Sequence, residues 1–245
     1  MTMRKRALLL LLLPFAAAAN EMEAISLLYY ERPPLITLQQ DGHVKGLLAE
    51  PVAKIFARAR LPVKWVRVPP NRAIQSIKTG HGDECTFGWH KSAEREAFAS
   101  FSLPYYLDHT PVALVRTDFV VAEGSGFFEL VNRPGTRLGV RENVYYGDYL
   151  QGLIESMPKE NLVLLNVDNS AIARMIHARR ADLTILVDDE VEPVIAEAGL
   201  SPADFQVVRL NDVAHPEYRY VVCNLRTAAK VMGRINAAIK ELRLP

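Results

Sequence analysis

Apolar residues recur along the chain in two alternating patterns. Short apolar or alternating runs indicate strands, and apolar positions at three- and four-residue spacing indicate helices. The clearest helix is the last one, where Val231, Ile235 and Ile239 line one face. The predicted strands cover residues 24–30, 63–68, 84–89, 112–115, 137–140, 162–165, 182–187, 205–209 and 218–223. The predicted helices cover residues 48–60, 71–79, 145–155, 170–178, 191–198 and about 225–245, with a short one capped by Ser92.

This alternation of strands and helices predicts an α/β fold with mostly parallel sheets. The strand–helix series runs once up to the strand at residues 112–115 and then begins again. Two such series followed by a final helix predict two α/β lobes. In sheets of this kind, small ligands bind at the carboxyl ends of the strands.

The first nineteen residues have the pattern of a secretory signal peptide. A basic head at residues 4–6 precedes a leucine-rich run at 7–15 and four alanines at 16–19. We expect cleavage after Ala19, the alternative being an uncleaved anchor. The apolar run is shorter than the roughly 20 residues that a membrane-spanning helix needs. The sequence therefore predicts an exported, periplasmic protein that is not inserted in the membrane after cleavage.

Composition narrows the function classes. The 245 residues are 49% hydrophobic, enough for a packed core, and carry 29 basic against 28 acidic residues. Removing the three basic residues of the head gives 26 − 28 = −2, so nothing favours binding to nucleic acid. Cys85 and Cys223 are the only cysteines. Export permits a disulfide between them, and two buried thiols are the alternative.

Motifs of catalysis and of cofactor binding are missing from the sequence. It contains no nucleophile elbow, no phosphate-binding loop and no dinucleotide fingerprint. The acidic run at residues 188–190 fits the first turn of a helix better than a metal site. We therefore predict no enzymatic activity, no catalytic residues, no cofactor and no metal.

The segment at residues 80–106 resembles the solute-binding proteins of polar amino-acid ABC transporters, the family 3 extracellular solute-binding proteins. In that family a G-x-x-D element precedes a Thr-x-x-Arg turn and a Phe-Ser-x-Pro-Tyr stretch. Gly80 and Asp83 match the first element, residues 92–95 match the second with Ser for Thr, and residues 101–105 match the third. Pro34 and residues 46–50 also stand where the family has corresponding elements, in the same order along the chain.

The resemblance implies a two-lobed periplasmic-binding-protein-like (type II) fold, each lobe a mostly parallel sheet flanked by helices. Lobe 1 would comprise residues 20–111 and 225–245, and lobe 2 residues 112–224. Two crossing strands, near 112–116 and 218–223, would form the hinge, and the lobes would close on a small ligand. The implied partners are that ligand and an ABC transporter permease or another periplasmic protein, with the chain itself a monomer.

Arg95 is the best candidate for a ligand-binding residue in the first lobe. A guanidinium holds a carboxylate through two parallel hydrogen bonds, and the alternative for Arg95 is a surface ion pair with Glu94 or Glu96. Gly88 and His90 stand where relatives usually carry hydroxyls. The other candidates in this lobe are Trp89, Ser92, Tyr30, Arg32 and Arg72.

The second lobe departs further from the family pattern. Relatives hold the ligand carboxylate with a Gly-Thr-Thr-like turn, where this chain has Asn143, Val144 and Tyr145. Relatives place an amine-binding aspartate where this chain has Val187, one position before Asp188. We include Asn143, Tyr145 and Asp188 among the candidates, and Asp188 has the alternative role of a helix cap.

Three functions fit these observations. The first is an exported solute-binding protein for a small polar, carboxylate-bearing, amino-acid-like ligand, serving an ABC transporter or a sensor. The second is an accessory periplasmic protein that binds a protein partner and has lost small-ligand binding. The third is an enzyme of the dehydratase or lyase type on the same scaffold, with Glu142 or Asp188 as its acid.

Overall fold

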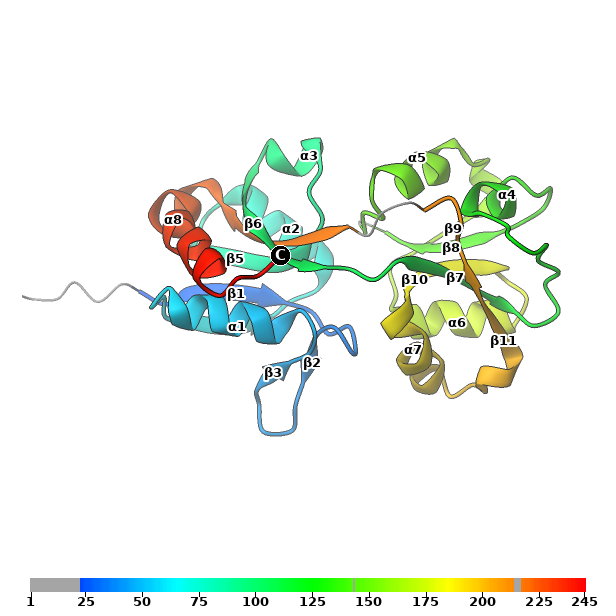
Figure 1. Cartoon of the computed structure of the whole chain (residues 1–245), viewed down its shortest axis with the longest axis horizontal. Coiled ribbons are helices and arrows are strands. Elements are labelled where there is room, and N and C mark those ends of the chain that lie inside the picture. Colours follow the sequence, from blue (N-terminus) through cyan, green and yellow to red (C-terminus); the bar gives the residue numbers. More distant parts are fainter. Residues whose placement is uncertain (1–22, 143, 214–216) are drawn as a thin grey trace, which may run out of the picture.

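The computed structural model describes residues 23–142, 144–213 and 217–245. Its two lobes lie side by side along the long axis and are joined by two chain crossings (Figure 1). The expected signal peptide and its cleavage site lie outside the described residues, as does Asn143. Within these ranges, the structure contains no helix with the length and hydropathy needed to cross a membrane.

The first lobe is built on a five-stranded sheet of order β4-β1-β5-β12-β6. Four helices belong to this lobe. Its strands are β1 (Ile25–Tyr29), β4 (Val63–Arg67), β5 (Glu84–Trp89), β6 (Ala99–Leu107) and β12 (Tyr218–Asn224), and its helices are α1 (Ala49–Arg58), α2 (Pro70–Thr79), α3 (Ala93–Glu96) and α8 (Leu225–Glu241). A separate hairpin pairs β2 (Thr37–Leu38) with β3 (Val44–Lys45).

The second lobe has a five-stranded sheet of order β11-β7-β10-β8-β9. Four α-helices accompany it. Its strands are β7 (Pro111–Arg116), β8 (Leu138–Arg141), β9 (Leu162–Leu165), β10 (Leu183–Val187) and β11 (Phe205–Arg209), and its helices are α4 (Phe127–Val131), α5 (Asp148–Ser156), α6 (Asn169–His177) and α7 (Val191–Ala198). The 3-10 helix η2 (Asp188–Glu190) joins β10 to α7.

Apolar faces of the helices close a core on both sides of each sheet. In the first lobe, α1 and α8 cover one face with residues such as Phe56 and Ile235, and α2 covers the other with Ala73 and Ile77. The second sheet likewise has one cluster around Phe127 and another around α6 and α7. The expected α/β architecture with two sheet-based lobes is confirmed.

One strand in each sheet runs against the others. Strand β7 is antiparallel to both β10 and β11, and β12 is antiparallel to both β5 and β6. Each is the first strand after the chain has crossed from one lobe to the other (Figure 1). The sheets are therefore mostly parallel, as predicted, because the remaining strands share one direction.

Two features of the first sheet differ from the sequence-based expectations. Strand β12 pairs with β5 and β6, so residues 218–224 belong to the first lobe and not to the second. Strand β6 was not predicted, because it contains Pro104, which lacks an N–H for the sheet. The β6–β12 register shifts near this proline, and the amide of Leu103 donates instead to Asn236 Oδ1 of α8 at 2.8 Å.

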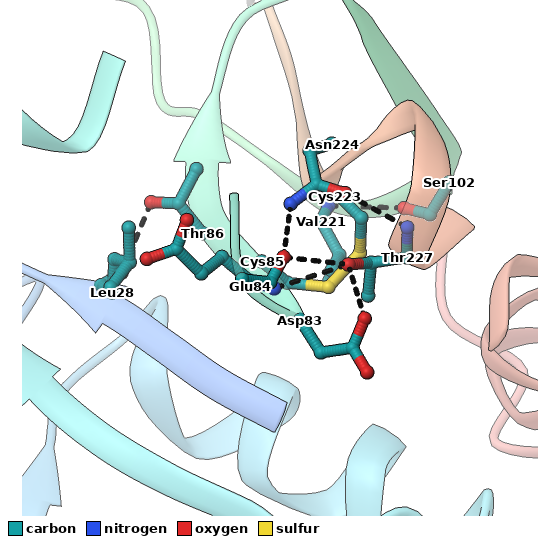
Figure 2. The surroundings of a disulfide bond; sticks show 11 residues. Leu28, Asp83, Glu84, Cys85, Thr86, Ser102, Val221, Cys223, Asn224 and Thr227 are labelled. Atoms are coloured by element: carbon teal, nitrogen blue, oxygen red, sulfur yellow. Dashed lines mark hydrogen bonds between the residues drawn. A yellow bond between two sulfur atoms is a disulfide. The ribbon is translucent and has the colours of Figure 1, made fainter. Parts of the chain in front are cut away.

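Cys85 and Cys223 form a disulfide, which decides between the two alternatives left open by the sequence (Figure 2). They lie opposite each other on the neighbouring strands β5 and β12. Thr227 supports the same junction, because its hydroxyl accepts from the amide of Glu84 at 3.1 Å (Figure 2). Asp83 of the G-x-x-D element forms an ion pair with Lys230 of α8, so its role here is structural.

Candidate ligand-binding cleft

A group of cavities opens between the two lobes, at the carboxyl ends of β1 and β5. The cavity around Arg95 is partly open to solvent. A neighbouring cavity shares part of its wall, including His90, Tyr145 and Arg219. The first cavity is lined by Tyr30, Arg32, Pro70, Ile74, Gly88, Trp89, His90, Arg95, Val144, Tyr145 and Arg219.

The end of β5 delivers three of the predicted residues to the cleft. Gly88 has a φ of +76°, a conformation that side chains other than that of glycine rarely adopt. A Cβ at this position would also lie 3.1 Å from Leu48 Cδ1. The turn at Gly88 places Trp89 and His90 in the wall of the cavity, and both are buried.

Arg95 lies between aromatic rings from both lobes. Its guanidinium carbon is 4.9 Å from the ring centre of Trp89 and 5.6 Å from that of Tyr145. Its Nη1 donates to the carbonyl of His90 at 3.0 Å, and Ser92 caps the short helix that carries it. Burial lowers the pKa of Arg95. The arginine is thus held at the interface between the lobes.

A buried polar network joins the end of β5 to the two crossings. His90 Nε2 is 2.9 Å from Asp108 Oδ2, and Arg219 contacts the same carboxylate at 2.8 and 2.6 Å. Arg219 also donates to the carbonyl of Gly88 at 2.8 Å. Burial would raise the pKa of Asp108, but the charge of Arg219 and the hydrogen bonds from His90 and Arg219 together hold this pKa well below its usual range. Asp108 therefore stays ionised and fixes His90 and Arg219 in the cleft.

An ion pair connects the lobes on the other side of the cleft. Arg32 Nε and Nη2 donate to the two carboxylate oxygens of Glu190 at 2.5 and 2.6 Å. Arg32 follows β1 and is positioned by backbone pairing with Ile36, and Glu190 is the last residue of η2. Burial by itself would lower the pKa of Arg32, but the attraction of Glu190 raises it overall.

Glu190 is the more buried partner of this pair, with a side chain that is 0% exposed. The side-chain amide of Asn169 and the backbone amide of Val187 lie within 3.3 Å of its carboxylate. Sequence reasoning missed Glu190, Asp108 and Arg219. The arginine and the carboxylate of each ion pair lie more than a hundred positions apart, so no local pattern marks them.

The remaining predicted residues are placed as follows. Tyr30, Arg32 and Tyr145 line the cavity of Arg95, and Ser92 lines an adjoining cavity with Arg95. Arg72 is exposed on α2 and is not part of the walls of these cavities. The structure does not bring Asp188 into the cleft, because β10 ends at Val187 and the Asp188 carboxylate turns toward Arg209, 3.4 Å away.

The chemistry that this cleft supports is recognition of a polar ligand. No cluster of three or more potential metal ligands occurs in the part of the chain that the structure describes. The functional groups of the cavity around Arg95 are guanidinium groups, aromatic rings and one buried histidine. Such groups bind anions and flat apolar surfaces.

Known proteins share the family and the fold of this chain. Residues 27–184 match the model of the bacterial extracellular solute-binding proteins, family 3. No curated protein matches the sequence. A histidine kinase sensor domain with similarity to periplasmic binding proteins shares the fold at a TM-score of 0.73, with 18% identity over 90% of each chain.

Two amino-acid-binding proteins also share the fold. One is the arginine-, lysine-, histidine-binding protein ArtJ from Geobacillus stearothermophilus, with a TM-score of 0.71 and 14% identity over 90% of each chain. The other is holo ArgBP from T. maritima, with a TM-score of 0.66 and 19% identity over 90% of each chain. The family match covers more than half of the sequence. The chain therefore belongs to the family 3 bacterial extracellular solute-binding proteins.

Proposed function

We propose that this protein is an exported binding protein that closes its two lobes around a small, carboxylate-bearing ligand. It recognises the ligand without transforming it. An ABC transporter or a membrane-bound sensor then reads the closed form. The family supports ligand binding, and its extracellular character supports export.

The cavity around Arg95 carries this proposal. Arg32, Arg95 and Arg219 all line it, and none of the described residues in its wall is an aspartate or a glutamate. The wall therefore presents guanidinium donors in a confined, partly buried space, with the charges of Arg32 and Arg219 offset by Glu190 and Asp108 behind them. Because a guanidinium binds a carboxylate through paired, charge-assisted hydrogen bonds, an anionic ligand is favoured there.

The disulfide supports export independently. Disulfides form and persist in oxidising compartments such as the bacterial periplasm. Cys85 and Cys223 are joined inside the first lobe, where both are fully buried. This agrees with the signal-peptide pattern of the first nineteen residues.

A thermal-melt screen tests the proposal. We would measure the melting temperature of the purified protein with amino acids, small organic acids, peptides and polyamines, each with wild type and Arg95→Ala. A ligand at 100 times its Kd adds about 2.7 kcal/mol, which corresponds to roughly 5–10 °C for a chain of this size. We expect a carboxylate to produce such a shift and Arg95→Ala to abolish it.

Arg180→Ala is the matched control, because Arg180 is exposed between α6 and β10. This variant should keep the full ligand-induced shift. If a hit survives Arg95→Ala, the protein binds ligands through a different site. If only polyamines shift the melting temperature, the assignment of a carboxylate ligand is wrong.

One observation favours a second candidate function, an accessory protein that binds a protein partner. The lobes are already connected by the protein's own groups, through Arg32 with Glu190 and through His90 with the carbonyl of Tyr145. A lobe arrangement held in this way does not need a ligand. Recovery of a defined protein complex from periplasm, with no small-molecule hit in the screen, would support this function.

A further inference from the structure

We propose that the cleft selects organic carboxylates that lack an ammonium group next to the carboxylate, and that the Arg32–Glu190 pair excludes α-amino acids. This inference rests on the proposed function and specifies its ligand class.

The two buried carboxylates of the cleft are each occupied by an arginine of the protein itself. Glu190 has a 0% exposed side chain and binds Arg32 through both oxygens. Asp108 has a 4% exposed side chain and binds Arg219 through both oxygens, with His90 as a further contact. Displacing either arginine would leave a buried guanidinium without its counterion, which is strongly unfavourable.

An α-amino acid carries its ammonium and its carboxylate on the same carbon atom. When the carboxylate binds Arg95, the ammonium must therefore find its acceptor in the same cavity. The described residues that line this cavity include three arginines and no carboxylate. An ammonium placed there would lose its water and lie among guanidinium groups, without a carboxylate in the described wall to pair with.

Other acidic residues lie nearby, but in different cavities. Glu217 lines the neighbouring cavity together with Asp108. Glu94 lines the outer cavity beyond Arg95 and is exposed. Neither contributes to the wall that holds Arg32, Arg95 and Arg219.

The rest of the wall indicates what the ligand carries besides its carboxylate. Tyr30, Trp89 and Tyr145 present aromatic rings, and Pro70 and Ile74 add apolar surface. A cavity that combines apolar walls with a few polar groups binds a ligand whose body is apolar. The ligand class that fits is therefore a monocarboxylate with a flat or branched apolar body.

Matched pairs of probes test this inference by isothermal titration at pH 7. The pairs are L-phenylalanine with 3-phenylpropanoate and L-leucine with 4-methylpentanoate, which differ only in the ammonium group. Phenethylamine serves as the control for the ring and the amine without a carboxylate. We expect at least one deaminated acid to bind at least tenfold more tightly than its amino acid, and phenethylamine not to bind.

The variant Arg32→Leu tests the role of the ion pair, because it leaves the Glu190 carboxylate available to an ammonium. We expect Arg32→Leu to reduce or reverse the preference for deaminated acids over amino acids. Arg32→Leu combined with Glu190→Gln should restore that preference. Circular dichroism melts would show that each variant is folded. The wild-type comparison stands by itself if a variant does not fold.

The outcomes separate the two proposals. If amino acids bind the wild type as tightly as their deaminated partners and Arg95→Ala abolishes this, the inference is wrong and the proposed function stands. If neither the panel nor the wider screen contains a carboxylate that binds, both are wrong. A preference that is unchanged in a folded Arg32→Leu variant would remove the ion pair from the explanation.

Discussion

At the scale of single residues, His90 has the most constrained chemistry in the cleft. Its ring has an acceptor on each side, the Asp108 carboxylate at Nε2 and the Tyr145 carbonyl at Nδ1. Burial, followed by the charge of Arg219, lowers the pKa of His90 to about 4. The imidazole is therefore neutral at pH 7 and can donate to only one of its two acceptors.

This lowered pKa predicts a loss of stability in mild acid. The unfolded chain binds a proton at His90 near pH 6.5, whereas the folded chain does so only near pH 4. The contribution of His90 to the free energy of unfolding is complete above pH 6.5 and falls by about 3 kcal/mol down to pH 4. The pKa of Asp108 is also lowered, and its contribution to the free energy of unfolding is lost only below about pH 4.

Urea unfolding between pH 7.5 and pH 4 would measure this effect. His90→Gln should lose most of the dependence on pH in that window. His43→Gln is the control, because the side chain of His43 is 77% exposed. Identical pH profiles for wild type and His90→Gln would show that His90 does not contribute in this way.

Sequence reasoning could predict the residues that lie at the end of a recognisable strand or at the start of a recognisable helix. Gly88, Trp89 and His90 lie at the end of a buried strand, and Arg95 lies at the start of a helix within a family motif. Glu190 was expected only as part of an acidic first turn. Its burial depends on Arg32, 158 positions away, and a single sequence has no signal for such a pair.

At the scale of elements, β12 connects the parts of the first lobe. It lies between β5 and β6, bonds covalently to β5 through Cys223, and continues directly into α8. Asn224 caps α8 by accepting from the amide of Thr227 at 2.8 Å (Figure 2). The side chain of Asn224 also donates to the carbonyl of Gly82 at 2.8 Å.

Removing the disulfide should therefore destabilise the first lobe. The two cysteines are 138 positions apart. Cross-linking so long a loop typically contributes about 3–5 kcal/mol. We expect Cys85→Ala combined with Cys223→Ala to lose that much free energy of unfolding in urea.

Adding a thiol reductant separates this effect from side-chain packing. Reductant should lower the stability of the wild type and leave the double variant unchanged. If reductant has no effect on the unfolding curve of the wild type, the bond does not contribute to stability under those conditions.

Most elements could be predicted because their apolar periodicity is local. Strand β6 could not, since its residues mix serine, proline and tyrosine with apolar positions. Its strand conformation depends on pairing with β12, which lies more than a hundred positions later in the sequence. For the same reason the lobe boundary at residue 224 was misplaced.

At the scale of the whole molecule, the ion pair between Arg32 and Glu190 is a contact that spans the two lobes. Removing one partner of a buried ion pair costs about 3–5 kcal/mol, because the other charge is left without its counterion. This cost applies only while the lobes keep Glu190 buried. Removing Arg32 therefore favours separation of the lobes, because separation exposes the Glu190 carboxylate to water.

Small-angle X-ray scattering would detect this change without a ligand. We expect Arg32→Leu to increase the radius of gyration of the protein relative to wild type. Arg209→Leu is the matched control, because Arg209 pairs with Asp188 inside the second lobe. Equal scattering profiles for all three proteins would show that the ion pair does not hold the lobes together.

The position of β12 also sets the order in which the two sheets can be completed as the chain emerges from its N-terminus to its C-terminus. Strands β7 to β11 of the second sheet lie in one continuous stretch, residues 111–209. The first sheet must wait for residues 218–224, because β6 pairs only with β12. We therefore expect the lobe that begins later in the sequence to finish folding first. The N-terminal lobe closes last, when the final strand enters its middle and the disulfide can form.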